Sequence, residues 1–310
     1  MNKVKFGRTG LKVSPLGFGA APIGFLDISE EKVAQILNEM LDEGVNLIDT
    51  AANYPGSEER IGKTVSHRRE EYILVSKCGH KLPDIDADAW SPRLIRETVE
   101  RSLRRLNTDH LDVMLLHSCS LQVLEQGDAL AALVKARDAG KIRVVGYSGD
   151  NDAAVYAAKI NDIEVLQTSV NVTDQANIDT VLPIARDREL GVMAKRPLAN
   201  AAWRELSEQP GMYSQYAETY TQRLAAMGIT PADVGFPGHA EMEWPEVALR
   251  FTLSQSGVHT AIAGTTSLIN ARANLAAARK GPLPDDVVQK LRDAFKAAQA
   301  QAGHTWPGQT

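Results

Sequence analysis

The chain lacks the features that mark secreted, membrane-spanning and nucleic-acid-binding proteins. Its 2 cysteines in 310 residues are too few for a disulfide framework. No apolar run approaches the ~20 residues that span a bilayer, and the opening MNKVKFGRTG has no apolar signal region. The formal net charge of -5 argues against the basic surface that nucleic acid requires. These absences predict a cytoplasmic protein without a membrane or nucleic-acid partner.

Short apolar runs alternate with amphipathic stretches along most of the chain. Eight of these runs are predicted strands: 16–19, 45–49, 72–77, 111–117, 142–147, 165–169, 191–195 and 260–264. Several are apolar throughout, as parallel strands are when helices cover both faces of the sheet. Helix starts lie between them, such as Ser29 before 30–44 and Ser91 before 92–106. The alternation predicts an α/β fold, a (β/α)8 TIM barrel formed by residues 1–310 as a single domain.

Three segments fall outside this alternation. Two short β-like runs flank the sequence GRTG at 7–10 and predict an N-terminal β-hairpin. The segment 199–243, after the seventh predicted strand, is long and rich in glycine, proline and aromatic residues. Such insertions in compact domains are usually binding loops or lids, and we expect one here. Residues 280–310 are expected to form a C-terminal helix and tail.

Polar side chains stand at the ends of three neighbouring predicted strands. Asp49 ends the second strand, Lys77 the third and His117 the fourth, while Tyr54 lies in the loop after the second. In such barrels the chemistry occurs at the carboxyl ends of the strands. A carboxylate, a phenol, an amine and an imidazole are therefore expected to meet at one mouth. This set suits proton transfer to a carbonyl, with the phenol as the acid.

The words around these residues resemble the aldo-keto reductase family. They are LDEGVNLIDTAANYPGSEERIGK, LVSKCG, RSLRRLNTDHLDVMLLH and GKIRVVGYS, and the likeness runs from GRTGLKVSPLGFGA to about Asn274. The N-terminal half is most similar to the branch that contains aldose and galactose dehydrogenases. The resemblance implies NAD(P)(H)-dependent interconversion of a carbonyl and an alcohol, without a metal. It also implies a small carbonyl or sugar substrate, and it leaves the oligomeric state open.

The resemblance makes Asp49, Tyr54, Lys77 and His117 the catalytic residues, and their roles have a physical basis. A tyrosine with a pKa near ~10 is a weak acid at neutral pH. The Lys77 ammonium is expected to stabilise the Tyr54 phenolate and lower this pKa, while Asp49 holds the ammonium. His117 is expected to orient the substrate oxygen or to help relay the proton. In the oxidative direction the Tyr54 phenolate would act as the base.

The resemblance also assigns cofactor positions. Ser148 matches a position that contacts the nicotinamide carboxamide, although Gly149 stands where the family usually has asparagine. Gln167 matches a position near the nicotinamide. The segment AGTTSLINARAN resembles the loop that binds the phosphates and adenine, with Gly264, Thr265, Ser267, Asn270 and Asn274. Backbone N–H groups at a helix N-terminus suit a phosphate.

Two parts of the cofactor site depart from the family. Where many members have Tyr-Ser-Pro-Leu, with an aromatic ring on the nicotinamide, this chain has Lys195, Arg196, Pro197 and Leu198. A cation here is expected to contact the pyrophosphate instead. Members selective for the 2′-phosphate often have Lys and Arg where Gly264 and Asn270 stand, and Arg272 is close by. The resemblance favours NADP(H), with NAD(H) as the alternative.

The same segments also contain residues that bind metals in other proteins. Two thiols and two imidazoles near neighbouring strand ends, Cys78, His80, His117 and Cys119, could bind zinc, and the thiols could form a disulfide. A dication would crowd Lys77, and neither cysteine has CxxC spacing, so no metal is expected. Two other functions also stay open. One is a nucleotide-binding sensor with negligible turnover, and the other is an aldolase in which Lys77 forms a Schiff base.

Substrate contacts are expected from two aromatic residues. Phe25 follows the first predicted strand, and Trp90 follows the third. Both loops open on the mouth at which the polar side chains are expected to meet. These two rings are therefore the predicted walls of the substrate pocket.

Overall fold

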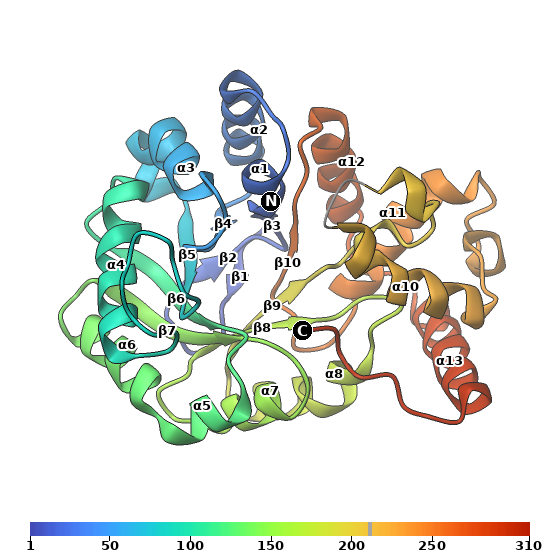
Figure 1. Cartoon of the computed structure of the whole chain (residues 1–310). Helices are drawn as coiled ribbons and strands as arrows, with labels where there is room; N and C mark the ends of the chain where they lie inside the picture. Colours follow the sequence, from blue (N-terminus) through green and yellow to red (C-terminus); the bar gives the residue numbers. More distant parts are fainter. Residues whose placement is uncertain (210–212) are drawn as a thin grey trace.

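Eight parallel strands form a closed barrel in the computed structural model, which describes residues 1–209 and 213–310 (Figure 1). In barrel order they are β3 (Leu16–Gly19), β4 (Leu47–Asp49), β5 (Ile73–Cys78), β6 (Leu111–His117), β7 (Ile142–Ser148), β8 (Val165–Ser169), β9 (Gly191–Lys195) and β10 (Thr260–Ala263). Strand β10 pairs with β3 and closes the barrel. The predicted (β/α)8 TIM barrel is confirmed.

Helices connect the strands and surround the barrel (Figure 1). The α-helices are α1 (Ala21–Phe25), α2 (Glu30–Asp42), α3 (Ser57–Val65), α4 (Pro92–Leu106), α5 (Leu121–Gln126), α6 (Asp128–Asp138), α7 (Asn151–Ala157), α8 (Ala176–Thr180), α9 (Leu182–Asp187), α10 (Tyr213–Met227), α11 (Ala240–Leu253), α12 (Leu268–Arg279) and α13 (Asp285–Ala302). Short 3-10 helices are η1 (Ser66–Glu71), η2 (Ala199–Ala201), η3 (Leu206–Glu208) and η4 (Pro231–Val234). In the described parts of the chain, none of the helices is both long and apolar enough to cross a membrane.

The two predicted helix starts are capped by serine side chains, as their sequences predict. The Ser29 hydroxyl accepts a hydrogen bond from the backbone N–H of Lys32 at 3.4 Å, and Ser91 accepts one from Leu94 at 3.2 Å. Each satisfies a donor that the first helical turn leaves without a partner. Strand β4 begins at Leu47, two residues later than predicted, and the Asn46 side chain just before it is hydrogen bonded to Lys12 and Ser14.

The N-terminal hairpin closes the amino end of the barrel. Its strands, β1 (Val4–Lys5) and β2 (Lys12–Val13), are antiparallel, as predicted. Phe6 and Val13 are fully buried in one apolar cluster with the barrel residues Val75, Leu115 and Met193. Burying a side chain of this kind stabilises the fold by about 1.5–3 kcal/mol. The barrel interior next to the hairpin, at the amino ends of the strands, is therefore filled with apolar side chains.

The side chains that point into the barrel are apolar near its amino end and polar near the mouth at its carboxyl end. Leu47 belongs to the apolar cluster, and Asp49 follows it by one pleat on β4. Val75 and Lys77 have the same relation on β5. Because every second side chain of a strand faces the same way, residues of one pair point into the same interior. The polar side chains thus lie at the carboxyl ends of the strands, next to the apolar cluster that fills the rest of the barrel interior.

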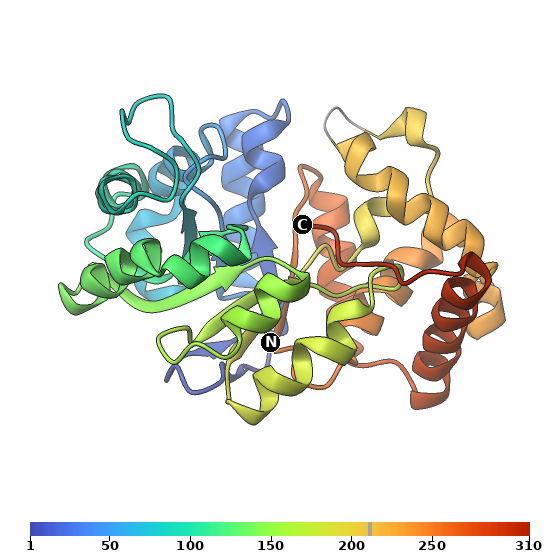
Figure 2. The same cartoon turned by 60° about the horizontal axis from the view of Figure 1, so that its bottom comes forward.

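The segment after β9 is folded rather than extended. It contains α10 and η4 and leads into α11, and these elements pack with α13 beside the barrel (Figures 1 and 2). Their core is a separate apolar cluster that includes Tyr220, Trp244, Phe251 and Leu291. Residues 210–212 of the expected 199–243 lid lie outside the described residues, and the lid role stays a prediction.

Candidate active site

A buried ion pair joins the ends of β4 and β5. The Lys77 ammonium lies 2.8 Å from both carboxylate oxygens of Asp49, and it also donates to the Thr50 carbonyl at 2.8 Å. Lys77 is 1% exposed and Asp49 is 3% exposed. Burial alone would lower the pKa of Lys77, but Asp49 and Tyr54 outweigh it and raise the pKa. The ammonium therefore stays charged at neutral pH.

Tyr54 lies directly beside this ammonium. The Lys77 nitrogen is 5.2 Å from the centre of the Tyr54 ring, close enough for its positive charge to act on the phenol. Burial raises the pKa of Tyr54, and the Lys77 charge opposes that rise without reversing it. The Lys77 charge lowers the pKa of Tyr54 as expected, but burial has the larger effect, so the pKa lies above its ordinary value. The phenol remains a proton donor at neutral pH, next to a charge that favours its phenolate.

His117 packs edge-to-face with Tyr54 and is a neutral imidazole. The two ring centres are 5.8 Å apart, with an interplanar angle of 77°. Burial lowers the pKa of His117 well below its ordinary value, and the positive charges of Lys77 and other neighbours lower it further. Its Nδ1 is buried and has no hydrogen-bond partner within the described residues. An unprotonated imidazole can position a polar substrate oxygen without competing with Tyr54 for the acid role.

This lowered pKa leads to a pH prediction. The unfolded chain takes up a proton on His117 near pH 6.5, whereas the native protein does not. Acidification through this range should therefore reduce the free energy of unfolding. In NMR spectra, the ring C–H resonance of His117 should show no titration step around the ordinary pKa of histidine, and His117→Gln identifies that resonance. A step near pH 6.5 would contradict the neutral imidazole.

Aromatic rings continue from Tyr54 in both directions. Phe25 lies 5.4 Å from Tyr54, His80 lies 5.0 Å from His117, and Trp90 lies 5.2 Å from His80, all between ring centres in edge-to-face contacts. The two predicted substrate residues, Phe25 and Trp90, thus stand at the two ends of one row of rings. The predictions did not include His80 in the pocket. Its position three residues after Lys77, just beyond β5, was the available signal.

The backbone of Trp90 is specialised to hold its ring in this row. Trp90 has a φ of 65°, in the left-handed region that few non-glycine residues adopt. Its ring packs directly on Gly79, where a β-carbon would overlap the indole. The Trp90 N–H donates to the Gly79 carbonyl at 3.0 Å. Gly79 is required here because only glycine allows this close approach.

The thiols and imidazoles near these strand ends do not form a metal site. In the ranges that the structure describes, three or more His, Cys, Asp and Glu side chains nowhere gather in a way that could hold a metal ion. Cys78 and Cys119 are buried free thiols. Burial raises the pKa of Cys119 to about 12 and that of Cys78 as well. Both therefore stay protonated, which suits packing better than reactivity.

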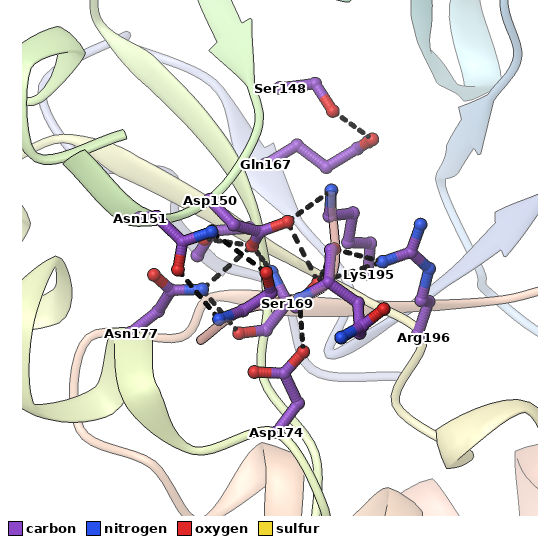
Figure 3. Close-up of polar contacts among 12 residues, drawn as sticks. Ser148, Asp150, Asn151, Gln167, Ser169, Asp174, Asn177, Lys195 and Arg196 are labelled. Atoms are coloured by element: carbon purple, nitrogen blue, oxygen red, sulfur yellow. Dashed lines mark hydrogen bonds and ion pairs between the residues drawn. The ribbon is translucent and has the colours of Figure 1, made fainter. Parts of the chain in front are cut away.

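Two predicted cofactor residues are tied to the ion pair by a chain of hydrogen bonds. The Ser148 hydroxyl donates to Gln167 Oε1 at 3.0 Å (Figure 3). Gln167 Nε2 in turn donates to Asp49 Oδ1 at 2.8 Å. The chain fixes the orientation of both side chains at the mouth. Gly149, where the family usually has asparagine, lies against Tyr147, and a β-carbon there would overlap the Tyr147 hydroxyl. The missing asparagine therefore has a steric cause.

The 195–198 segment divides into charged and packing residues. The Lys195 ammonium lies 2.8 Å from Asp150, which is 2% exposed. Arg196 donates to the Ser169 hydroxyl at 3.3 Å (Figure 3). Pro197 is buried, and its carbonyl accepts from Thr252, while Leu198 packs against the apolar core. Lys195 is therefore already paired with a carboxylate, Arg196 is the second cation of this segment, and Pro197 and Leu198 shape the loop.

Asp150 is a residue of this site that the sequence analysis missed. Its Oδ1 accepts hydrogen bonds from Thr168 at 3.0 Å, from the Ser169 N–H at 2.7 Å and from Asn177 at 2.8 Å (Figure 3). The Asp150 carboxylate thus holds the side chains and backbone between β7 and β9 in place at the barrel mouth. The available signal was a charged residue two positions after the strand that ends at Ser148. A carboxylate that is buried at such a position is rare unless it is paired.

The loop after β10 is held by hydrogen bonds between its own side chains and the start of α12. Thr265 Oγ1 accepts from the Ser267 N–H at 3.0 Å, and Ser267 Oγ accepts from the Asn270 N–H at 3.3 Å, at the beginning of α12. A β-carbon at Gly264 would overlap the Gly19 carbonyl, because β10 and β3 approach closely here. Asn274, one turn further, is 5% exposed, whereas Asn270 is exposed.

Arg272 does not face the loop as an uncommitted cation. Its guanidinium forms two hydrogen bonds with Glu39 of α2, at 2.6 and 2.9 Å. The Arg272 side chain is 61% exposed. The cation that the sequence places close to this loop is therefore already paired with a carboxylate.

A parallel barrel with this proton-transfer set at its mouth defines an α/β-barrel enzyme, and known proteins narrow the class. Residues 15–296 match the Aldo/keto reductase family. The oxidoreductase YqkF of Bacillus subtilis (strain 168) is 27% identical over 312 residues, covering 96% of this chain and 97% of that protein. L-galactose dehydrogenase of Arabidopsis thaliana is 28% identical, covering 87% of this chain and 86% of its own.

A solved structure agrees with this assignment. The holo form of an aldo-keto reductase from Bacillus halodurans has a TM-score of 0.78 with this chain at 27% identity, covering 95% of this chain and 96% of that one. The chain belongs to the aldo-keto reductase family. It is an oxidoreductase of a family that uses nicotinamide cofactors.

Proposed function

We propose that this enzyme interconverts a carbonyl and an alcohol with NAD(P)(H), and that Tyr54 is the general acid and base. The observation that carries the proposal is the buried Asp49–Lys77 ion pair, whose ammonium lies 5.2 Å from the centre of the Tyr54 ring. The substrate is proposed to be an aldehyde, a ketone or a sugar. The similarity to an L-galactose dehydrogenase supports the sugar, and a cytoplasmic location stays a prediction.

The residues at the mouth fit a dinucleotide. Neutral amide and hydroxyl groups, Ser148 and Gln167, lie next to the proton-transfer residues and suit a carboxamide. The cations Lys195 and Arg196 suit the pyrophosphate. The N-terminal N–H groups of α12 suit a further phosphate. We propose that these groups, with Gly264, Thr265, Ser267, Asn270 and Asn274, hold the cofactor, which supplies or accepts the hydride.

The roles of the protein groups follow from their charges. In reduction, Tyr54 gives its proton to the carbonyl oxygen as negative charge develops there. Lys77 stabilises the forming phenolate, and Asp49 keeps the ammonium charged and in place. His117 is uncharged, and it orients the substrate carbonyl oxygen toward Tyr54. In oxidation the same groups act in reverse, with Tyr54 as the base.

The alternative functions make different experimental claims. A Schiff base requires a neutral amine, whereas Lys77 is fully engaged and its pKa is raised. Steady-state oxidation of NADPH and NADH with a panel of aldehydes, ketones and sugars, in both directions, tests the proposal. Turnover supports it. Dinucleotide binding without turnover would favour a sensor, and borohydride trapping of a substrate on Lys77 would favour an aldolase.

Cofactor preference is expected to depend on Glu39. NADP(H) is the proposed cofactor, but the Glu39–Arg272 pair withholds the guanidinium that a 2′-phosphate would attract. Glu39→Ala should therefore improve the Kd for NADPH relative to NADH by about 2- to 5-fold, the equivalent of one exposed ion pair. Fluorescence titration with both dinucleotides measures this ratio.

A matched variant controls for the loss of a surface carboxylate. Glu43 pairs with Arg279 at the other end of α12, so Glu43→Ala frees a cation far from the loop. It should leave the ratio of the two Kd values unchanged. An unchanged ratio in Glu39→Ala as well would show that Arg272 does not reach the cofactor.

A further inference from the structure

The chain returns from α13 to the mouth of the barrel. After Gly303 the backbone leaves the helix and runs across to β8 and β9 (Figures 1 and 2). Trp306 anchors this path: it is 7% exposed, its ring lies 5.1 Å from that of Phe295, and the Arg223 guanidinium lies 5.4 Å from its ring centre. Arg223 also donates to the Pro307 carbonyl at 2.8 Å. We call residues 306–309 the strap.

The end of the strap is held by hydrogen bonds to its backbone. Asn151 exchanges two bonds with Gly308, donating to its carbonyl at 2.9 Å and accepting from its N–H at 2.7 Å. The Gln309 N–H donates to Asp174 at 2.9 Å. The Gln309 carbonyl lies 3.1 Å from the Ser169 hydroxyl and accepts from Arg196. Each of the two residues is thus fixed through both of its main-chain groups.

The socket under Gly308 fits a glycine. A β-carbon there would lie 2.8 Å from the β-carbon of Asp150, 3.1 Å from Asn177 Nδ2 and 3.3 Å from Asn151 Oδ1. Real β-carbons essentially never approach an atom to less than 3.0 Å. Any larger residue at 308 must therefore lift the strap or displace the Asp150 network.

The strap binds Arg196, a residue that is proposed to bind the cofactor. Arg196 is the guanidinium proposed for the pyrophosphate, and here it binds Gln309 and Ser169. The loop that carries it is in an unusual conformation, because Arg196, Ala199, Asn200 and Ala201 have φ values of 56°, 44°, 49° and 55°. Non-glycine residues keep such conformations only where their surroundings hold them. Removing the strap removes one of these restraints.

We propose that the strap is an internal competitor of the dinucleotide, docked on Arg196 in the free enzyme and displaced when the cofactor pyrophosphate binds. This inference rests on the proposed function. Competition by a docked segment weakens the measured affinity in proportion to the fraction of molecules whose site is open. A strap that is docked in nine of ten molecules would raise the measured Kd about 10-fold.

Two substitutions that loosen the strap from different sides test the proposal. Gly308→Ala fills the socket, and Asn151→Gly removes the paired bonds while tolerating the positive φ of 58° at that position. Both should lower the Kd for NADPH by up to about 10-fold. Thr305→Ala, an exposed change just before the strap, is the control and should leave the Kd unchanged. Fluorescence titration gives the three values.

Hydrogen exchange supplies a readout that does not depend on activity. The amides of Gly308 and Gln309 should be protected in the free enzyme and should exchange faster after NADPH is added. Equal Kd values in all variants, weaker binding in the loosened ones, or greater amide protection with NADPH would each overturn the competition. If no variant and no wild-type protein bound NADPH or NADH, the proposed function itself would fail.

Discussion

Tyr54→Phe is expected to lower kcat for carbonyl reduction by at least ~100-fold, the lower end of what general acid catalysis contributes. The substitution removes the hydroxyl that the proposal assigns to proton transfer and retains the ring. The contacts of that ring with Phe25 and His117 do not involve the hydroxyl. Dinucleotide binding should therefore stay within about 2-fold of wild type, because no proposed cofactor contact is lost. Steady-state kinetics and fluorescence titration measure the two quantities.

A second tyrosine provides the control. Tyr72 is buried, and its hydroxyl makes one long hydrogen bond of 3.4 Å to the Val65 carbonyl, away from the barrel mouth. Tyr72→Phe removes the same atom from the protein and should leave kcat near that of wild type. If Tyr54→Phe also kept near-normal turnover, the proton would have to come from another group and the proposed role of Tyr54 would be wrong.

Lys77→Met is expected to affect both activity and stability. It removes the charge that stabilises the phenolate, which should reduce kcat by about 100- to 1000-fold, the cost of losing one preorganised electrostatic contact. It also leaves the Asp49 carboxylate buried without its partner. Breaking a buried pair in this way should reduce the free energy of unfolding by about 3–5 kcal/mol. Urea denaturation and steady-state kinetics measure the two effects.

A double variant separates the two consequences. Replacing Asp49 by Asn together with Lys77→Met removes both charges, so it should recover part of the lost stability and none of the lost activity. An exposed pair serves as the comparison: Lys63→Met breaks the contact with Glu30 and should cost about 1 kcal/mol or less. A Lys77→Met protein that was as stable as Lys63→Met would contradict the buried ion pair.

The barrel could be predicted because its strands are local features. Apolar runs such as 111–117 and 165–169 coincide with β6 and β8. The rule that barrel chemistry lies at strand ends then predicts that Asp49, Lys77 and His117 lie at one mouth. The ion pair and the contact with Tyr54 needed no more than neighbouring strands in register.

Long-range contacts and net electrostatics could not be predicted in this way. Gln167 reaches Asp49 across 118 positions of sequence, and Gly308 reaches Asn151 across 157. No pattern in either segment announces such a bond. The direction of the Tyr54 pKa shift also depends on how much burial opposes the Lys77 charge, which is a property of the packed protein. The same holds for Arg272, whose partner Glu39 comes from the other end of the chain.

The central claim is that the Tyr54 hydroxyl, beside the Lys77 ammonium, faces the carbonyl that receives the hydride. A crystal structure of the enzyme with NADP+ and a carbonyl-bearing inhibitor tests it most directly. The claim predicts the inhibitor oxygen within about 2.6–3.2 Å of Tyr54 Oη, with a ring nitrogen of His117 at a similar distance. An oxygen bound elsewhere, with Tyr54 turned away from it and still paired with Lys77, would contradict the claim.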